Sequence, residues 1–217
     1  MSAVDELRQR LEQCSTEERK AVFDYLRETI PIHPFEVTMN AKAEVIMEAM
    51  ARASDLSLRG IRGLIGEATF AVEIAPHLEG WRDVTPPGNH AYDVALADAV
   101  STARVQVKMQ RRKEHVAWLR GGVGVVEVQR TRGGERAGED TRPYHFGGFD
   151  ILAVCMEPSH RKWDSFLYIP ERWLISRPGD NNLIDKLQPV PLQPDAIWTD
   201  DFHEVVRRLR SGVARPI

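Results

Sequence analysis

The stretch Tyr92–Met109, YDVALADAVSTARVQVKM, decides the fold of this 217-residue chain. Apolar residues dominate Tyr92–Ala97, and they alternate with polar residues over Ala103–Met109, so each segment predicts a β-strand. The polar segment between them predicts a tight turn, which we place near Val100. The two strands should therefore pair as an antiparallel hairpin.

The hairpin brings together side chains of different chemistry. With the turn centred near Val100, we expect Asp93 to face Val107 across the pair. Gln106 and Lys108 flank Val107 and, being two residues apart, point to the same side of their strand. A carboxylate, an amide and an ammonium group at one end of a hairpin are unusual in a core. They are typical of a hydrolytic site.

The chain after the hairpin predicts further strands. The apolar run Phe149–Met156 indicates a buried central strand, and Gly122–Gln129 and Phe166–Ile169 indicate two more. Residues 131–148 and 176–195 are rich in polar residues, glycine or proline, and we expect both to be loops.

Helical spacing dominates the N-terminal part, residues 1–58, where Ser15 or Thr16 is an expected helix cap. Pro31 and Pro34 predict a loop over 31–37. Further helices are expected over about 39–53, 60–78, 170–174 and Asp200–Leu209. The predicted fold class is α/β, with a central mixed β-sheet flanked by helices and an N-terminal helical region.

Composition narrows the class of protein. Hydrophobic residues make up 42% and charged residues 28%, which is typical of a globular chain that needs no disulfides to fold. Cys14 and Cys155 stand alone, which favours a reducing cytoplasm over a disulfide framework or a cysteine zinc site. We find no membrane-length apolar run and no signal-peptide pattern. We therefore expect a cytoplasmic protein without a membrane partner.

The charge is unevenly distributed. The net charge is −3, yet residues 101–145 hold ten Lys and Arg against five Asp and Glu. A basic region on an acidic body can bind a polyanion such as nucleic acid. A solvated run of charges is the alternative interpretation.

The hairpin residues suit a Mg²⁺ site, because Mg²⁺ prefers oxygen ligands and keeps several waters. Asp93 is one expected ligand. Glu67, on the preceding helix, is the second acid, and Gly66 beside it allows that helix to approach the sheet closely. The Val107 carbonyl can supply another oxygen. Lys108 can orient or deprotonate an attacking water, or stabilise the phosphate.

The pattern Asp93-x12-Gln106-Val107-Lys108, after a helix bearing Glu67, resembles the PD-(D/E)xK nuclease superfamily. The segments Val126–Arg132, Thr141–Tyr144, Phe149–Val154 and Trp163–Trp173 resemble bacterial restriction-endonuclease-like proteins of that group. The resemblance covers about residues 58–175. It departs at Gln106, where the family usually carries Asp or Glu, and an amide is a poorer Mg²⁺ ligand than a carboxylate.

The resemblance implies a Mg²⁺-dependent type II restriction endonuclease with a restriction-endonuclease-like fold, for which Mn²⁺ can substitute and no organic cofactor is needed. Such an enzyme cuts double-stranded DNA at a short sequence, usually as a homodimer. Residues 58–217 would form the nuclease domain, and residues 1–57 would serve dimerisation or DNA contact. Two alternatives stay open: a repair, nicking or recombination nuclease on the same fold, or a DNA-binding module that has lost catalysis.

Basic and polar residues near the predicted site are candidates for DNA contact. Arg111, Arg112 and Lys113 directly follow the lysine strand and suit phosphate contact, whereas the polar run after the next strand suits base reading. Two arginines near the expected start of the Glu67 helix suit a phosphate as well. The full set is Arg59, Arg62, Arg111, Arg112, Lys113, Gln129, Arg130, Thr131, Arg132 and Arg142.

Overall fold

A computed structural model gives the coordinates of the chain. It describes residues 2–130, 135–136, 139–140 and 142–216. Thr131 and Arg132, predicted to read bases, therefore lie outside the described residues, as do parts of the predicted 131–148 loop.

The chain divides into two compact units, Met1–Leu58 and Arg59–Ile217. The helices of the first are α1 (Ala3–Gln13), α2 (Thr16–Thr29), α3 (Phe35–Met39) and α4 (Ala43–Ala51), and α5 (Asp55–Thr69) begins within it. Ser15 caps α2 as predicted, and Glu18 bonds back to it as a capping box. The predicted loop 31–37 is too long, because α3 starts inside it.

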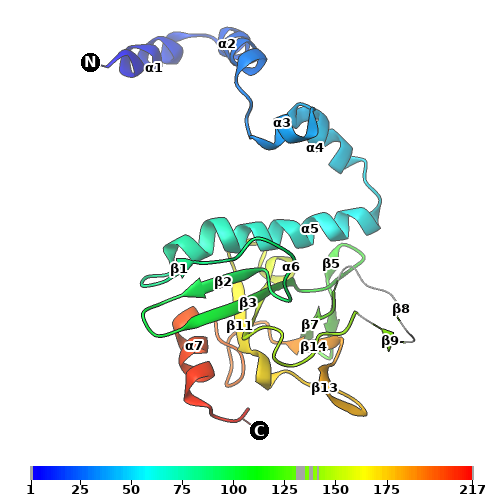
Figure 1. The fold of residues 1–217 in the computed structure, drawn as a ribbon. Coiled ribbons are helices and arrows are strands. Elements are labelled where there is room, and N and C mark those ends of the chain that lie inside the picture. The colour runs from blue at the N-terminus through cyan, green and yellow to red at the C-terminus, as the bar shows by residue number, and fades with distance from the viewer. Residues whose placement is uncertain (1, 131–134, 137–138, 141, 217) are drawn as a thin grey trace. The chain divides into compact units, whose positions relative to one another are not determined.

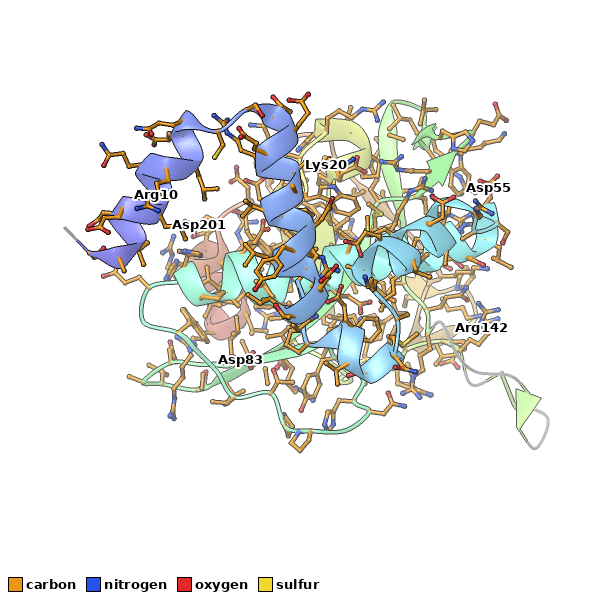
Figure 2. All side chains as sticks on the ribbon, turned by 90° about the horizontal axis from the view of Figure 1, so that it is seen from above. Arg10, Lys20, Asp55, Asp83, Arg142 and Asp201 are labelled. Atoms are coloured by element: carbon orange, nitrogen blue, oxygen red, sulfur yellow. The ribbon has the colours of Figure 1, made fainter. Side chains whose placement is uncertain are left out.

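The N-terminal unit has an ion pair where a core is expected. Among its described residues only Glu36 is buried. The Glu36 carboxylate lies 2.7 Å from the Arg27 guanidinium, which also contacts Glu44 at 2.9 Å. Apolar side chains such as Phe23, 53% exposed, face outward, and exposed charges such as Arg10 and Lys20 (Figure 2) lie on α1 and α2.

A mixed five-stranded sheet, in the order β1-β2-β3-β10-β11, forms the centre of the second unit (Figure 1). Its strands are β1 (Arg82–Asp83), β2 (Val94–Ala97), β3 (Thr102–Met109), β10 (Ile151–Cys155) and β11 (Phe166–Pro170). β2 and β3 pair antiparallel, β3 and β10 parallel, and β10 and β11 antiparallel. The predicted α/β class with a mixed central sheet is therefore confirmed, as is the central strand within Phe149–Met156.

The predicted hairpin is confirmed, but its register is wrong by one residue. Val94 pairs with Val105 and Ala97 with Thr102, so continuing this register puts Gln106, not Val107, opposite Asp93. The Asp98 carboxylate causes the shift, because it accepts the backbone N–H groups of Val100 and Ser101 and tightens the turn. The observed register places Asp93 and Gln106 on the same face.

The two faces of the sheet carry different residues. Val105 and Val107 lie in an apolar cluster with Phe70 and with α7 (Phe202–Ser211), while α5 lies along the sheet (Figure 1). The alternate residues Gln106 and Lys108 lie beside Leu152 and Val154, which belong to a second cluster on the other face. The polar side chains therefore emerge among apolar neighbours.

The helix that carries Glu67 differs from its prediction. Instead of 60–78, α5 begins at Asp55 and ends at Thr69, and is followed by a π-turn, η1 (Phe70–Ile74), and a 3₁₀ turn, η2 (Ala75–His77). Gly66 is buried, and a Cβ there would lie 3.5 Å from the Cys155 Cβ, which confirms the close approach to the sheet.

The last two predicted helices are also displaced. The predicted helix 170–174 is a short 3₁₀ turn, η3 (Glu171–Trp173). The predicted helix Asp200–Leu209 is α7, which is capped by the side chain of Asp201 (labelled in Figure 2). None of the described helices combines the length and apolarity that crossing a membrane requires.

Short elements cover the second face. A three-stranded sheet has the order β14-β7-β6, and the remaining strands form two-stranded ribbons. One short helix, α6, lies between β10 and β11 in the sequence. Their bounds are β4 (Arg112–Lys113), β5 (Val116–Ala117), β6 (Leu119–Arg120), β7 (Val123–Glu127), β8 (Glu135–Arg136), β9 (Glu139–Asp140), α6 (Glu157–His160), β12 (Ser176–Arg177), β13 (Asp180–Ile184) and β14 (Leu187–Val190). The predicted strand 122–129 therefore pairs outside the central sheet, and the predicted loop 176–195 contains three strands.

Candidate active site

Asp93 is fixed to the neighbouring strand by its backbone and its side chain. It comes just before β2, and its backbone N–H donates to the Val105 carbonyl at 2.9 Å. One carboxylate oxygen, Oδ2, accepts the Val107 backbone N–H at 2.8 Å and the Gln106 Nε2. The Asp93 carboxylate thus takes the place of a main-chain acceptor where the strand pairing ends.

Gln106 is 1% exposed and bonds through both ends of its amide. Its Nε2 donates to Asp93 Oδ2 and, at 3.3 Å, to the Val107 carbonyl. Its Oε1 accepts the Tyr144 hydroxyl at 3.1 Å. An amide N–H group therefore lies between two of the three groups that the sequence predicts as metal ligands, Asp93 and the Val107 carbonyl.

Lys108 and Glu67 complete the cluster. Lys108 is half-buried on the same face of β3 as Gln106, and its Nζ lies 5.7 Å from the centre of the Tyr144 ring. Glu67 is half-buried on α5, and burial and the Asp93 charge raise its pKa to about 7, while Lys108 opposes that rise. The structure thus places Asp93, Gln106 and Lys108 together at the end of the hairpin, and Glu67 near enough for the charges of Asp93 and Lys108 to affect its pKa.

The Asp93 carboxylate is affected in the same direction. Burial raises the pKa of Asp93, although the Lys108 charge and the bonds from Val107 and Gln106 act to lower it. Burial makes it unfavourable for both the Glu67 and the Asp93 carboxylates to carry their negative charge. A cation between them would relieve the cost of charging both.

The donors of this cluster are oxygens, which suit Mg²⁺ or Mn²⁺. Among the residues that the structure describes, no three His, Cys, Asp or Glu side chains group as metal ligands. The cluster instead offers two carboxylates, from Glu67 and Asp93, and the main-chain oxygen of Val107. One or two carboxylates completed by waters and substrate phosphate are the usual Mg²⁺ ligand set in proteins.

Two of the three predicted phosphate contacts after β3 form ion pairs within the protein. The guanidinium of Arg111 pairs with Glu127 and lies 5.4 Å from the centre of the Trp118 ring. Arg112 pairs with Glu157 on α6. Lys113 is exposed in the β4–β5 hairpin.

Two of the residues that follow β7, Gln129 and Arg130, have different surroundings. Gln129 donates to Glu127, whereas Arg130 is exposed and its guanidinium carbon lies 5.7 Å from the centre of the Tyr144 ring. The Arg142 carbonyl accepts the Arg130 backbone N–H at 2.9 Å, and Arg142 is labelled in Figure 2. Arg130 therefore lies near the same aromatic ring as Lys108.

The placement of Arg59 and Arg62 corrects the prediction that they lie near a helix start. Because α5 begins at Asp55, they lie in its second and third turns, away from its free N–H groups. Burial, and to a lesser extent the Arg59 charge, lower the pKa of Arg111. That the guanidinium groups of Arg59 and Arg62 contact DNA phosphates stays a prediction.

The sequence interpretation missed the role of Tyr144. Its hydroxyl reaches Gln106 across 38 positions of sequence, and its ring is near Lys108 and Arg130. In the sequence it is an aromatic residue in a polar segment just before a buried strand, at the end of the segment Thr141–Tyr144 quoted above for the resemblance. That signal does not distinguish a site residue from a core residue.

Comparison with solved structures finds a bacterial homing endonuclease, I-Ssp6803I, at 17% sequence identity and a TM-score of 0.39. The match covers 73% of this chain and 96% of that one. No protein-family model matches the chain, and no curated protein matches it.

Proposed function

We propose that the chain is a Mg²⁺-dependent endonuclease that hydrolyses phosphodiester bonds in double-stranded DNA. The observation that carries the proposal is the cluster of Asp93, Gln106, Lys108 and Glu67 at one end of a hairpin, with two carboxylate pKa values raised. Structural ion pairs normally lower carboxylate pKa values, whereas catalytic sites raise them through burial and like charge.

Each residue of the cluster has a defined task in this reaction. Glu67, Asp93 and the Val107 carbonyl would hold the cation. A Mg²⁺ ion held there would supply a more acidic water and would neutralise charge on the phosphate. Lys108 orients the water that attacks phosphorus, and its ammonium stabilises the charge that develops on the phosphate oxygens. Cleavage of the P–O3′ bond would leave 3′-hydroxyl and 5′-phosphate ends, as the family resemblance implies.

The exposed cations suit the phosphate chain. Arg130 lies near the same aromatic ring as Lys108, and Lys113 and Arg59 are exposed on elements of the same unit. Such groups fix the position of a duplex without reading its sequence. Arg111 and Arg112 act differently in this proposal: their ion pairs with Glu127 and Glu157 hold the β4–β5 hairpin in place.

The N-terminal region suits dimerisation better than DNA contact. Residues 1–57 carry eleven Asp and Glu against seven Lys and Arg, so phosphate would be repelled. Their outward-facing apolar side chains, including Phe23, suit a protein partner. A homodimer would supply two sites, one for each DNA strand, as a type II restriction enzyme requires.

A second candidate function is a DNA-binding module without catalysis. It is favoured by Gln106, whose amide presents a donor to Asp93 where a third carboxylate would complete a stronger metal site. This candidate binds duplex DNA with a steep salt dependence and cuts it with neither Mg²⁺ nor Mn²⁺.

Incubation of the full chain with supercoiled plasmid and Mg²⁺ tests the proposal. We expect discrete linear fragments from the wild type and at least about a hundredfold slower cleavage by Lys108→Ala. Lys162→Ala, which removes an exposed lysine elsewhere, should cut like the wild type. Binding without cleavage by the wild type would favour the second candidate, and nicked circles alone would favour a nicking or repair enzyme.

A further inference from the structure

Tyr144 lies in the candidate site, although it is neither a proposed metal ligand nor the proposed catalytic lysine. Its side chain is 5% exposed and packs edge-on against Phe149, with ring centres 5.6 Å apart. It belongs to the apolar cluster on the Gln106 face of the sheet. Its position is therefore fixed by packing, and its polar end points into the site.

The hydroxyl of Tyr144 holds one end of the Gln106 amide. It donates to Gln106 Oε1 at 3.1 Å, while Nε2 at the other end of the amide donates to Asp93 and the Val107 carbonyl. Burial, and to a lesser extent the Asp93 charge, raise the pKa of Tyr144 to about 12, so the hydroxyl keeps its proton at neutral pH. A buried amide keeps the partners that satisfy it, because an unpaired buried polar group costs free energy.

The ring of Tyr144 contacts the cations of the site. Lys108 Nζ and the Arg130 guanidinium carbon each lie 5.7 Å from its centre. Cations at this distance from an aromatic ring are attracted by its electrons. One side chain thus contacts the amide next to Asp93, the proposed catalytic lysine and the proposed phosphate contact.

We propose that Tyr144 is the positioning residue of this site. Its hydroxyl fixes the Gln106 amide beside Asp93, and its ring fixes Lys108 and Arg130. The Asp93 carboxylate and the Val107 carbonyl only accept hydrogen bonds, so the amide turns its Nε2 towards them, and the Tyr144 hydroxyl holds the opposite end of the amide through Oε1. The catalytic part of this inference rests on the proposed function, whereas the positioning of Gln106 does not.

The first test observes Gln106 directly, without metal or DNA. The side-chain ¹⁵NH₂ signals of Gln106 are identified by their absence in Gln106→Leu. In the wild type we expect two well-separated signals protected from exchange, and in Tyr144→Phe faster exchange by about tenfold or more. Tyr168→Phe, which removes a buried hydroxyl from the opposite apolar cluster, should leave them unchanged. Unaltered Gln106 signals in Tyr144→Phe would overturn the proposal.

The second test is a double-mutant cycle in binding of Mn²⁺ alone, measured by calorimetry on the full chain. Tyr144→Phe and Gln106→Leu should each weaken binding by about three- to tenfold, the effect of one net hydrogen bond. The double variant should be no weaker than Gln106→Leu, because both changes break the same interaction. Effects that multiply would show that Tyr144 does not act through Gln106.

The ring is tested by DNA affinity in Ca²⁺. Tyr144→Leu should weaken binding of duplex DNA more than Tyr144→Phe does, since only leucine removes the ring beside Lys108 and Arg130. Equal affinities of the two variants would overturn the role of the ring. Absence of plasmid cleavage by the wild type overturns the proposed function alone, because the amide signals and the Mn²⁺ cycle do not depend on cleavage.

Discussion

The carboxylates of the two units have opposite electrostatic environments. In the N-terminal unit the Arg27 guanidinium lowers the pKa of Glu36, and it lowers the pKa of Glu44 to about 2. At the end of the β2–β3 hairpin, burial raises the pKa of Asp93, and it raises the pKa of Glu67 to about 7. The first pair is stabilised as charges by the fold. The second pair is held where charge costs free energy.

This contrast separates structural acids from functional ones. A carboxylate that accepts hydrogen bonds from a cation stabilises the fold, whereas a buried pair of carboxylates without a cation lowers the free energy of unfolding. Burial also raises the pKa of Glu171, but that carboxylate accepts the Gly147 backbone N–H at 2.8–2.9 Å and so anchors a loop. At Glu67 and Asp93 a bound cation would remove the cost.

The largest expected effect is that of Glu67→Gln on the rate of DNA cleavage. Glu67→Gln keeps the size of the side chain but removes the charge that would hold Mg²⁺, so we expect DNA cleavage to slow by about a hundredfold or more. Glu73→Gln, an exposed position in η1, should cut at the wild-type rate. Plasmid cleavage rates at saturating Mg²⁺ measure both, and equal rates for the two variants would remove Glu67 from the site.

The same substitution should stabilise the fold at high pH. Because the folded Glu67 carboxyl holds its proton up to about pH 7, ionising it costs folding free energy, and stability falls as the pH rises from 4.5 to 7. Glu67→Gln lacks this loss, so we expect a gain of about 1–3 kcal/mol at pH 8 and little change at pH 4.5. Urea unfolding without divalent ions measures both, and a destabilised variant at pH 8 would contradict the account.

The N-terminal unit should respond to pH in the opposite direction. Since the pKa of Glu44 is lowered from 4.5 to about 2, its contribution is present above pH 4.5 and is lost as the pH falls towards 2. We expect the helical NMR signals of α2 and α4 to weaken over that interval. Arg27→Met should abolish this pH dependence. A transition near pH 7 in α2 would indicate that other groups hold the unit together.

The sequence predicted those parts of the fold that depend on neighbouring residues. Alternation over Ala103–Met109 and the apolar run around Ile151–Cys155 predicted β3 and β10 correctly. The strands β13 and β14 were missed because Asp180-Asn181-Asn182 and Pro189 are typical of turns. β14 pairs with the distant strand β7, and β13 pairs with its neighbour β12, and in both cases the pairing overrides local preference.

The candidate site shows the same limit. Asp93, Gln106 and Lys108 share one hairpin, so their proximity followed from spacing even though the register was wrong by one residue. The pairing of Arg112 with Glu157 joins residues 45 positions apart. Such contacts depend on the packing of β4 and α6, which no local pattern in the sequence encodes.

The central claim, that Asp93 holds a divalent cation next to Lys108, is tested most directly by Asp93→Asn. Mn²⁺ binding by calorimetry and plasmid cleavage are measured on the same preparation. The account predicts one Mn²⁺ site per chain in the wild type, and in Asp93→Asn at least about a tenfold loss of affinity together with loss of cleavage. An Asp93→Asn protein that binds Mn²⁺ and cuts DNA like the wild type would contradict it.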